Sequence, residues 1–127
     1  MEILAALFVE NFDIRQATGG AARLDLGGAH FSFAAPSEPP VTVEPHLVVI
    51  VRCPPEHSGM AALEVTFHRD DEQIARNVQP LQVEPGKFNY RLVKGELTYE
   101  TLGTIEARCR IDQGPVMTVP LTLLPPV

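Results

Sequence analysis

Proline and glycine interrupt this chain so often that it has little room for long helices. Its 127 residues include twelve prolines and nine glycines. A proline inside a helix removes a backbone hydrogen bond and clashes with the preceding turn, so it kinks or ends the helix. Between these breaks the residues alternate or are β-branched, which is typical of strands. The sequence therefore predicts an all-β fold made of short strands.

The spacing of the breaks predicts one domain with eight strands. The length of 127 residues suits a single domain, 1–127, with one hydrophobic core. Turn signals recur about every eight to twelve residues, as in a β-sandwich. We expect an antiparallel immunoglobulin-like β-sandwich of seven to nine strands. The expected strands are 2–9, 22–33 (broken at Gly27 and Gly28), 46–53, 61–69, 73–83, 87–93, 103–112 and 116–124.

The segments between these strands give further expectations. Residues 11–17 are predicted as a short helical turn, and 36–45 as a proline-rich linker. Asp70 and Asp71 predict a tight hairpin turn, because an Asp side chain can bond to nearby backbone amides. Pro120 has no N–H to donate, so its strand is expected at a sheet edge or with a bulge. The side chains expected in the core include Leu63, Phe67, Ile105 and Val119.

Two of the strands, 2–9 and 46–53, carry apolar residues on both faces. Such a strand is either central and covered, or part of an interface. Coverage by segment 10–22 or 34–45 and contact with a partner both remain open. On the partner hypothesis, the expected interface residues are Val48, Ile50, Leu4 and Phe8.

Composition and charge argue against several kinds of partner. The chain has 16 Asp and Glu against 10 Lys and Arg, and an excess of acid is unfavourable for binding nucleic acid. The longest central aliphatic run, 47–51, is far shorter than the ~20 residues of a membrane-spanning helix. The opening segment lacks the basic start of an export signal. We expect a cytoplasmic protein whose partner is another protein or itself, with a homodimer as one option.

No motif predicts catalysis, a metal or a cofactor. The four histidines have none of the paired spacings of zinc sites. His57 lies beside Glu56 and Ser58 in a loop, but no nucleophile elbow is present. His68 lies near the acidic turn. We expect no enzyme, and a hydrolase using His57 or His68 is a lesser alternative.

Cys53 and Cys109 are both expected to point inward. Their spacing is similar to that of the intersheet cystine of immunoglobulin domains, but the chain has no Trp to pack against it. Free buried thiols that act as small apolar side chains are favoured, and a disulfide remains open.

Three parts of the chain carry a family resemblance. They are Leu7–Phe12, then Pro45–Val51 with Leu63–Phe67, and finally Leu102–Asp112 with Val119–Leu123. In the order of these features the chain resembles an uncharacterised family of small bacterial immunoglobulin-like β-sandwich proteins. The resemblance implies the fold and no activity. Gln113 separates Asp112 from Gly114, where such hairpins often have Asp-Gly directly, so this turn is one residue longer.

The sequence therefore favours a non-enzymatic module that binds another protein or itself. A second hypothesis is a small-ligand carrier with a cavity between its two sheets.

Overall fold

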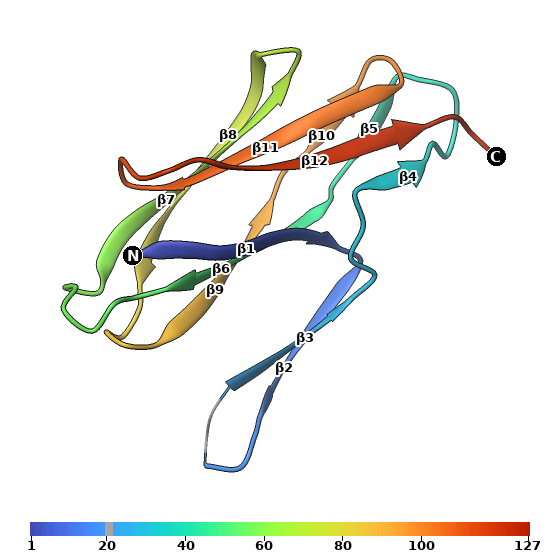
Figure 1. The fold of residues 1–127 in the computed structure, drawn as a ribbon. Helices are drawn as coiled ribbons and strands as arrows, with labels where there is room; N and C mark the ends of the chain where they lie inside the picture. Colours follow the sequence, from blue (N-terminus) through green and yellow to red (C-terminus); the bar gives the residue numbers. More distant parts are fainter. Residues whose placement is uncertain (20–21) are drawn as a thin grey trace.

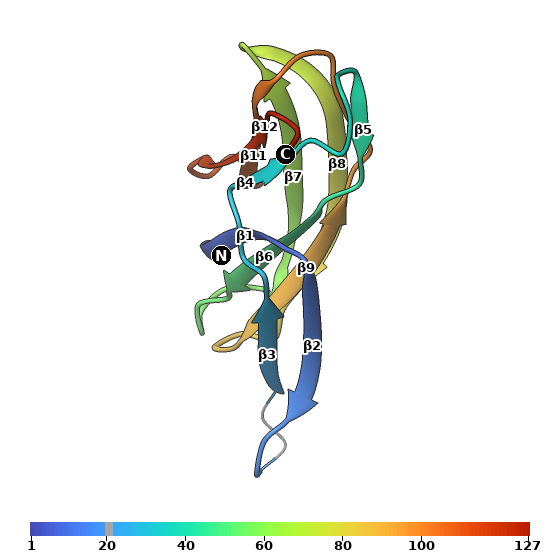
Figure 2. The same ribbon diagram turned by 90° about the vertical axis from the view of Figure 1, so that its right-hand side faces the viewer.

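The computed structural model describes residues 1–19 and 22–127, and within them all the regular structure is β. Two sheets face each other, and a separate hairpin projects from them (Figures 1 and 2). No helix in the described part of the chain is long and apolar enough to span a bilayer. The strands are β1 (Glu2–Val9), β2 (Asn11–Gln16), β3 (Ala22–Gly27), β4 (Ser32–Ala34), β5 (Val41–Val43), β6 (His46–Arg52), β7 (Met60–Arg69), β8 (Glu72–Gln82), β9 (Phe88–Lys94), β10 (Leu97–Tyr99), β11 (Gly103–Ile111) and β12 (Met117–Leu124).

The smaller sheet has the order β1-β6-β9, and the larger sheet has the order β4-β12-β11-β7-β8. The pair β5-β10 continues the β6-β9 ladder past an irregularity at Glu44 and Pro45. Neighbouring strands are antiparallel except for β4, which lies parallel to β12. Pro120 lies opposite Glu106 of β11, and no described strand pairs with β12 on its other side at this point, since β4 pairs only with the last three residues of β12. This agrees with the expected edge position.

Two expectations about local structure are wrong. The segment predicted as a helical turn forms β2, which pairs with β3 from Asn11 to Gln16. Its apolar residues Phe12 and Ile14 alternate with charged ones, which is the period of a strand and not of a helix. The predicted linker also contains the short strand β5. The structure therefore describes twelve strands, more than the seven to nine expected.

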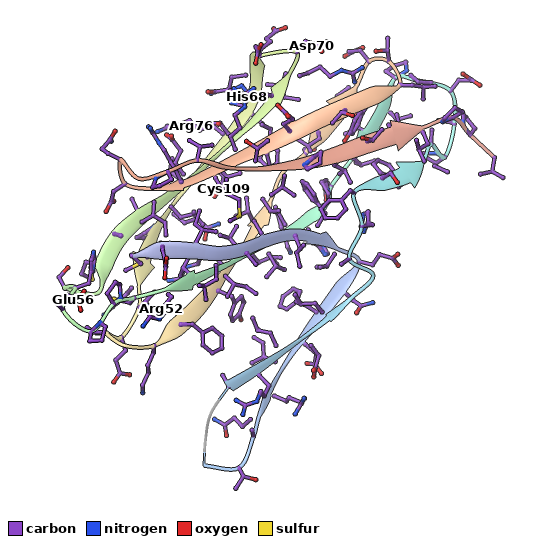
Figure 3. The ribbon with its side chains drawn as sticks, viewed as in Figure 1. Arg52, Glu56, His68, Asp70, Arg76 and Cys109 are labelled. Atoms are coloured by element: carbon purple, nitrogen blue, oxygen red, sulfur yellow. The ribbon has the colours of Figure 1, made fainter. Side chains whose placement is uncertain are left out.

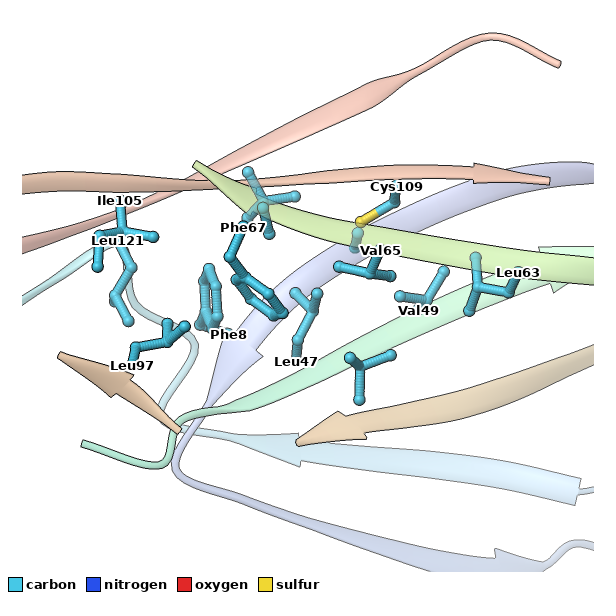
Figure 4. Close-up of a cluster of buried hydrophobic side chains, with 14 of the residues drawn as sticks. Phe8, Leu47, Val49, Leu63, Val65, Phe67, Leu97, Ile105, Cys109 and Leu121 are labelled. Atoms are coloured by element: carbon cyan, nitrogen blue, oxygen red, sulfur yellow. The ribbon is translucent and has the colours of Figure 1, made fainter. Parts of the chain in front are cut away.

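The core fills the space between the two sheets, as Figure 4 shows. Leu63, Phe67, Ile105 and Val119 are all buried there, which confirms the predicted orientation of their strands. Tyr99 is also buried, and its hydroxyl donates a 2.7 Å hydrogen bond to the Leu121 carbonyl oxygen. This bond satisfies the polar end of a large side chain in an apolar setting.

A β-bulge in β1 overturns the predicted faces of that strand. The register moves from Ile3 opposite Val51 to Ala5 opposite Ile50, so Leu4 is the extra residue. Side chains alternate across a strand, and one extra residue reverses the alternation. Phe8 therefore points into the core, where it has no exposed surface, whereas Leu4 is 49% exposed. The prediction that Leu4 and Phe8 share one outward face is wrong.

The base of the β2-β3 hairpin covers part of the outer face of the smaller sheet. The ring of Phe12 in β2 lies 6.2 Å from that of Tyr90 in β9. On the same outer face Val48 pairs with Leu7 and Leu92, and only 1% of Val48 is exposed. Coverage by the chain itself, one of the two explanations left open by the sequence, accounts for this apolar face.

The outer face of the larger sheet carries charged and polar residues. Glu64 in β7 accepts hydrogen bonds from Arg76 in β8 at 2.9 and 3.0 Å, and from Arg110 in β11 at 3.2 Å. The Arg76 hydrogen bond is the main cause of a lowered pKa for Glu64. These charged residues are therefore paired with one another within the chain.

Candidate functional site

The uncovered end of the smaller sheet carries exposed apolar and basic side chains together. In the outer row of this end, Arg52 of β6 pairs with Glu2 of β1 and with Phe88 of β9. Phe88 is 45% exposed, and the bulge residue Leu4 also lies at this end. A groove of about 720 Å³ opens between this row and the β2-β3 hairpin. We call it the hairpin groove, and its apolar and charged lining residues are Leu4, Ala22, Arg23, Arg52, Lys87 and Phe88.

The charged residues that line the hairpin groove are all basic. Arg52 lies 3.6 Å from the Glu2 carboxylate, and Lys87 lies 3.0 Å from the Glu84 carboxylate. Arg23 donates to the backbone oxygen of its neighbour at 3.0 Å. All these side chains are exposed, and exposed ion pairs contribute at most about 1 kcal/mol. The cations therefore remain available to an acidic partner.

The turn between β7 and β8 gathers carboxylates at the other end of the molecule. Asp70 and Asp71 both have positive φ angles, of 50° and 67°, and Arg69 pairs directly with Glu72. A two-residue hairpin turn of this kind needs positive φ at both central positions, and Asp tolerates it better than most residues. We call Asp70, Asp71 and Glu72 the acidic tip. Figure 3 shows Asp70 at this tip and Arg52 at the opposite end of the sandwich.

Further acids flank the acidic tip. A cleft of about 460 Å³ beside it brings together Asp70, Glu72, Glu96 and Glu100. One cation, Arg69, also lines this cleft, and its guanidinium donates to the Thr101 carbonyl oxygen at 2.9 Å and to that of Leu102 at 2.7 Å. Asp71 itself pairs with Arg108 of β11 at 2.8 Å, so the uncompensated negative charge of this narrow protrusion comes from Asp70 and Glu72, with Glu96 and Glu100 beside them.

The four predicted interface residues separate into two groups. Phe8 and Val48 are buried within the chain, so they cannot form an exposed partner surface, and the prediction is wrong for both. Leu4 lines the hairpin groove, and Ile50 is half-buried on the same outer face. For these two residues, contact with a partner stays a prediction. Three further residues that line the groove, Phe88, Lys87 and Arg23, are not among those predicted from the sequence.

The histidines considered for hydrolysis lie apart from each other. The Nδ1 atom of His57 accepts a 3.0 Å hydrogen bond from the Gly59 amide, which holds a local turn. The Nε2 atom of His68 lies 2.8 Å from the Thr66 hydroxyl. Neither ring has a hydrogen bond to a carboxylate among the described residues, and no group of three or more His, Cys, Asp or Glu there could hold a metal ion.

Cys53 and Cys109 are free and fully buried, so the disulfide left open by the sequence is not formed. Burial raises the pKa of the Cys109 thiol to about 12. Because the thiolate is the reactive form, native protein at about pH 8 is expected to resist alkylation by iodoacetamide, with both thiols reacting after denaturation. Mass spectrometry measures this. Rapid labelling of Cys109 in the folded protein would contradict its placement in the core.

Comparison of the chain with family models, curated proteins and solved structures found no match. The resemblance to an uncharacterised sandwich family therefore stays a prediction.

Proposed function

We propose that the protein is a non-enzymatic interaction module that associates head to tail with copies of itself. In this arrangement the acidic tip of one copy enters the hairpin groove of the next. The observation that carries the proposal is the placement of a basic, partly apolar groove and an acidic protrusion at opposite ends of one chain.

Charge supports this arrangement over a symmetric one. A two-fold contact made by the groove alone would bring Arg52 and Lys87 of one copy against the same cations of the other. Like charges that face each other across an interface are unfavourable, whereas opposite potentials steer the partners together. When the acidic tip of one copy lies in the basic groove of the next, opposite charges face each other across the contact. Contacts of this head-to-tail type leave a free groove and a free tip, so they allow further copies to add.

Shape supports it as well. The turn at Asp70 and Asp71 has only two central residues, so the end of the β7-β8 hairpin is narrow. It projects at the top of Figure 1, away from the β2-β3 hairpin. Ile74 follows the acidic tip and is 40% exposed, which offers an apolar side chain to Leu4 and Phe88. The contact would therefore bury apolar surface from both copies in addition to pairing opposite charges.

We also propose that the sandwich is of the immunoglobulin-like type. The support is its connectivity: the chain passes between sheets from β6 to β7 and from β8 to β9, and β11 then returns beside β7. Such crossings between hairpin-linked strands are the Greek-key feature of immunoglobulin-like sandwiches. A cytoplasmic location stays a prediction, and the two free thiols suit a reducing compartment.

Sedimentation velocity over micromolar to millimolar concentrations tests the proposed function. At about 20 mM salt we expect the sedimentation coefficient to rise with concentration beyond the value of a dimer, and at about 500 mM salt to fall back towards the monomer. Leu4→Asp adds a negative charge and removes an apolar contact in the groove, so we expect it to weaken association about tenfold.

Val78→Asp is the matched control, since Val78 is also 49% exposed but lies on β8, outside the groove and the acidic tip. It is expected to associate as the natural chain does. A natural chain that stays monomeric throughout this range, or that associates equally at both salt concentrations, would overturn the proposal.

A further inference from the structure

A second opening lies on the side of the sandwich, between the two sheets. It has a volume of about 470 Å³ and is separate from the hairpin groove. Strands β4 and β12 supply one wall, and the bend between β5 and β6 supplies the other. Figure 2 shows where these strands lie in the fold. We call this opening the side cleft. The residues that line it are Glu10, His30, Ser32, Phe33, Val43, Glu44, Pro45 and Leu121.

The floor of the side cleft is part of the packed core. Leu121 is only 1% exposed, and its carbonyl oxygen accepts the Tyr99 hydroxyl. The ring of Phe33 meets that of Tyr99 edge-on at 5.9 Å, with an angle of 78° between the ring planes. These contacts fix an apolar floor with an aromatic ring in it, which is a common lining for small-molecule sites.

One side of the rim is held by the backbone. The Glu10 amide donates to the Gly27 carbonyl oxygen at 3.0 Å, and the His30 amide donates to that of Phe8 at 2.9 Å. Gly28 has a φ of +65°, and a Cβ there would lie 2.7 Å from Cγ of Glu10. Glycine at this position therefore lets the Glu10 side chain lie close over the backbone. The positions of Glu10 and His30 do not depend on a ligand.

The polar atoms of the rim are mostly hydrogen-bond acceptors. Nδ1 of His30 lies 2.7 Å from the Gly28 carbonyl oxygen, so in the neutral ring this nitrogen carries the proton and Nε2 is an acceptor. The carboxylates of Glu10 and Glu44 can only accept. Neither carboxylate forms an ion pair with a cation in the described part of the chain.

From this combination we infer that the side cleft binds a small molecule with an ammonium group on an apolar, preferably aromatic, body. The ammonium donates to Glu10 and Glu44, and the body packs against Phe33 and Val43. The cleft volume lies within the range of small-ligand pockets, which is roughly 300–1,000 Å³. An ammonium near the Phe33 ring also gains a cation–π attraction.

A free small molecule suits the side cleft better than an extended peptide. The chain crosses between the sheets both before β4, after His30, and after β4, on the way to β5 (Figure 2). A peptide strand lying through the opening would meet one of these crossings. A compact amine enters from the side and needs no edge strand.

Amide-resolved NMR titration of the full chain with 2-phenylethylamine tests this inference. We expect saturable shifts at Phe33, Val43 and Glu44, with binding about tenfold tighter than that of the uncharged analogue 2-phenylethanol. The negatively charged 3-phenylpropanoate is expected to give no saturable shifts. Because the hairpin groove is not involved, this result does not depend on self-association.

Glu10→Gln combined with Glu44→Gln removes both charges and keeps the side-chain size. This variant is expected to bind the amine about tenfold more weakly, with its amide spectrum otherwise unchanged. The control combines Glu38→Gln with Glu56→Gln, two exposed acids outside the cleft, and is expected to bind normally. No saturable shift, equal binding of amine and alcohol, or equal loss in the control would overturn the inference.

Discussion

Phe8→Ala is expected to lower the free energy of unfolding by about 3–5 kcal/mol. Phe8 has no exposed surface, and it packs with Leu47 and Phe67 between the sheets (Figure 4). Truncation removes buried apolar area and leaves a cavity that the rigid strands around it cannot close. Urea denaturation, followed by circular dichroism, gives the loss from the shift of the midpoint.

Phe88→Ala is the matched control for this prediction. It removes the same ring from a residue that is 45% exposed, so the loss is expected to stay below about 1 kcal/mol. Equal losses for the two variants would show that the bulge at Leu4 does not turn Phe8 into the core.

Val48→Asp is expected to destabilise the fold by about 3–5 kcal/mol at neutral pH, even in a monomer. Val48 is 1% exposed beneath the hairpin base. Its cross-strand neighbours are Leu7 and Leu92, and neither side chain can pair with an ionised carboxylate. Burial raises the pKa of such a carboxyl, so the folded chain binds its proton more tightly than the unfolded chain. The stability of this variant is therefore expected to fall as the pH rises above about 4.

Denaturation of Val48→Asp across a pH series measures this effect. Leu4→Asp serves as the control, because the same substitution at a residue that is 49% exposed is expected to change stability by less than about 1 kcal/mol at any of these pH values. A Val48→Asp variant as stable as Leu4→Asp would mean that the hairpin does not cover the sheet.

The all-β fold and the position of most strands could be predicted because apolar and polar residues alternate along a strand that has one buried face. Leu63 and Phe67 alternate with Glu64 and Thr66, and the structure buries the first pair against the core. The two consecutive Asp residues, Asp70 and Asp71, also predicted the position of the turn that they form. Where a strand has one solvent-exposed face, the alternation of apolar and polar residues is sufficient to predict which side chains are buried.

The incorrect predictions have separate local causes. The bulge at Leu4 adds one residue to β1, and no composition signal marks it, so strict alternation predicts the wrong face for Phe8. The short strand β2 has alternating Phe12 and Ile14, but its exposed polar residues also suit a helical turn. The hairpin groove could not be foreseen, because it is formed by the side of β2-β3 and by Phe88, which lie far apart in the sequence.

A mixing experiment tests head-to-tail association most directly. One variant, Arg52→Glu with Lys87→Glu, keeps its acidic tip but reverses the charge of its groove. The other, Asp70→Asn with Asp71→Asn and Glu72→Gln, keeps its groove but neutralises its tip, and Asn tolerates the positive φ angles at 70 and 71.

Sedimentation velocity at low salt should find each variant monomeric alone, and a dimer with no larger species when the two are mixed in equal amounts. One intact tip and one intact groove then meet, and both ends of the pair are blocked. Monomers in the mixture, or oligomers of either variant alone, would contradict the association of acidic tip with hairpin groove.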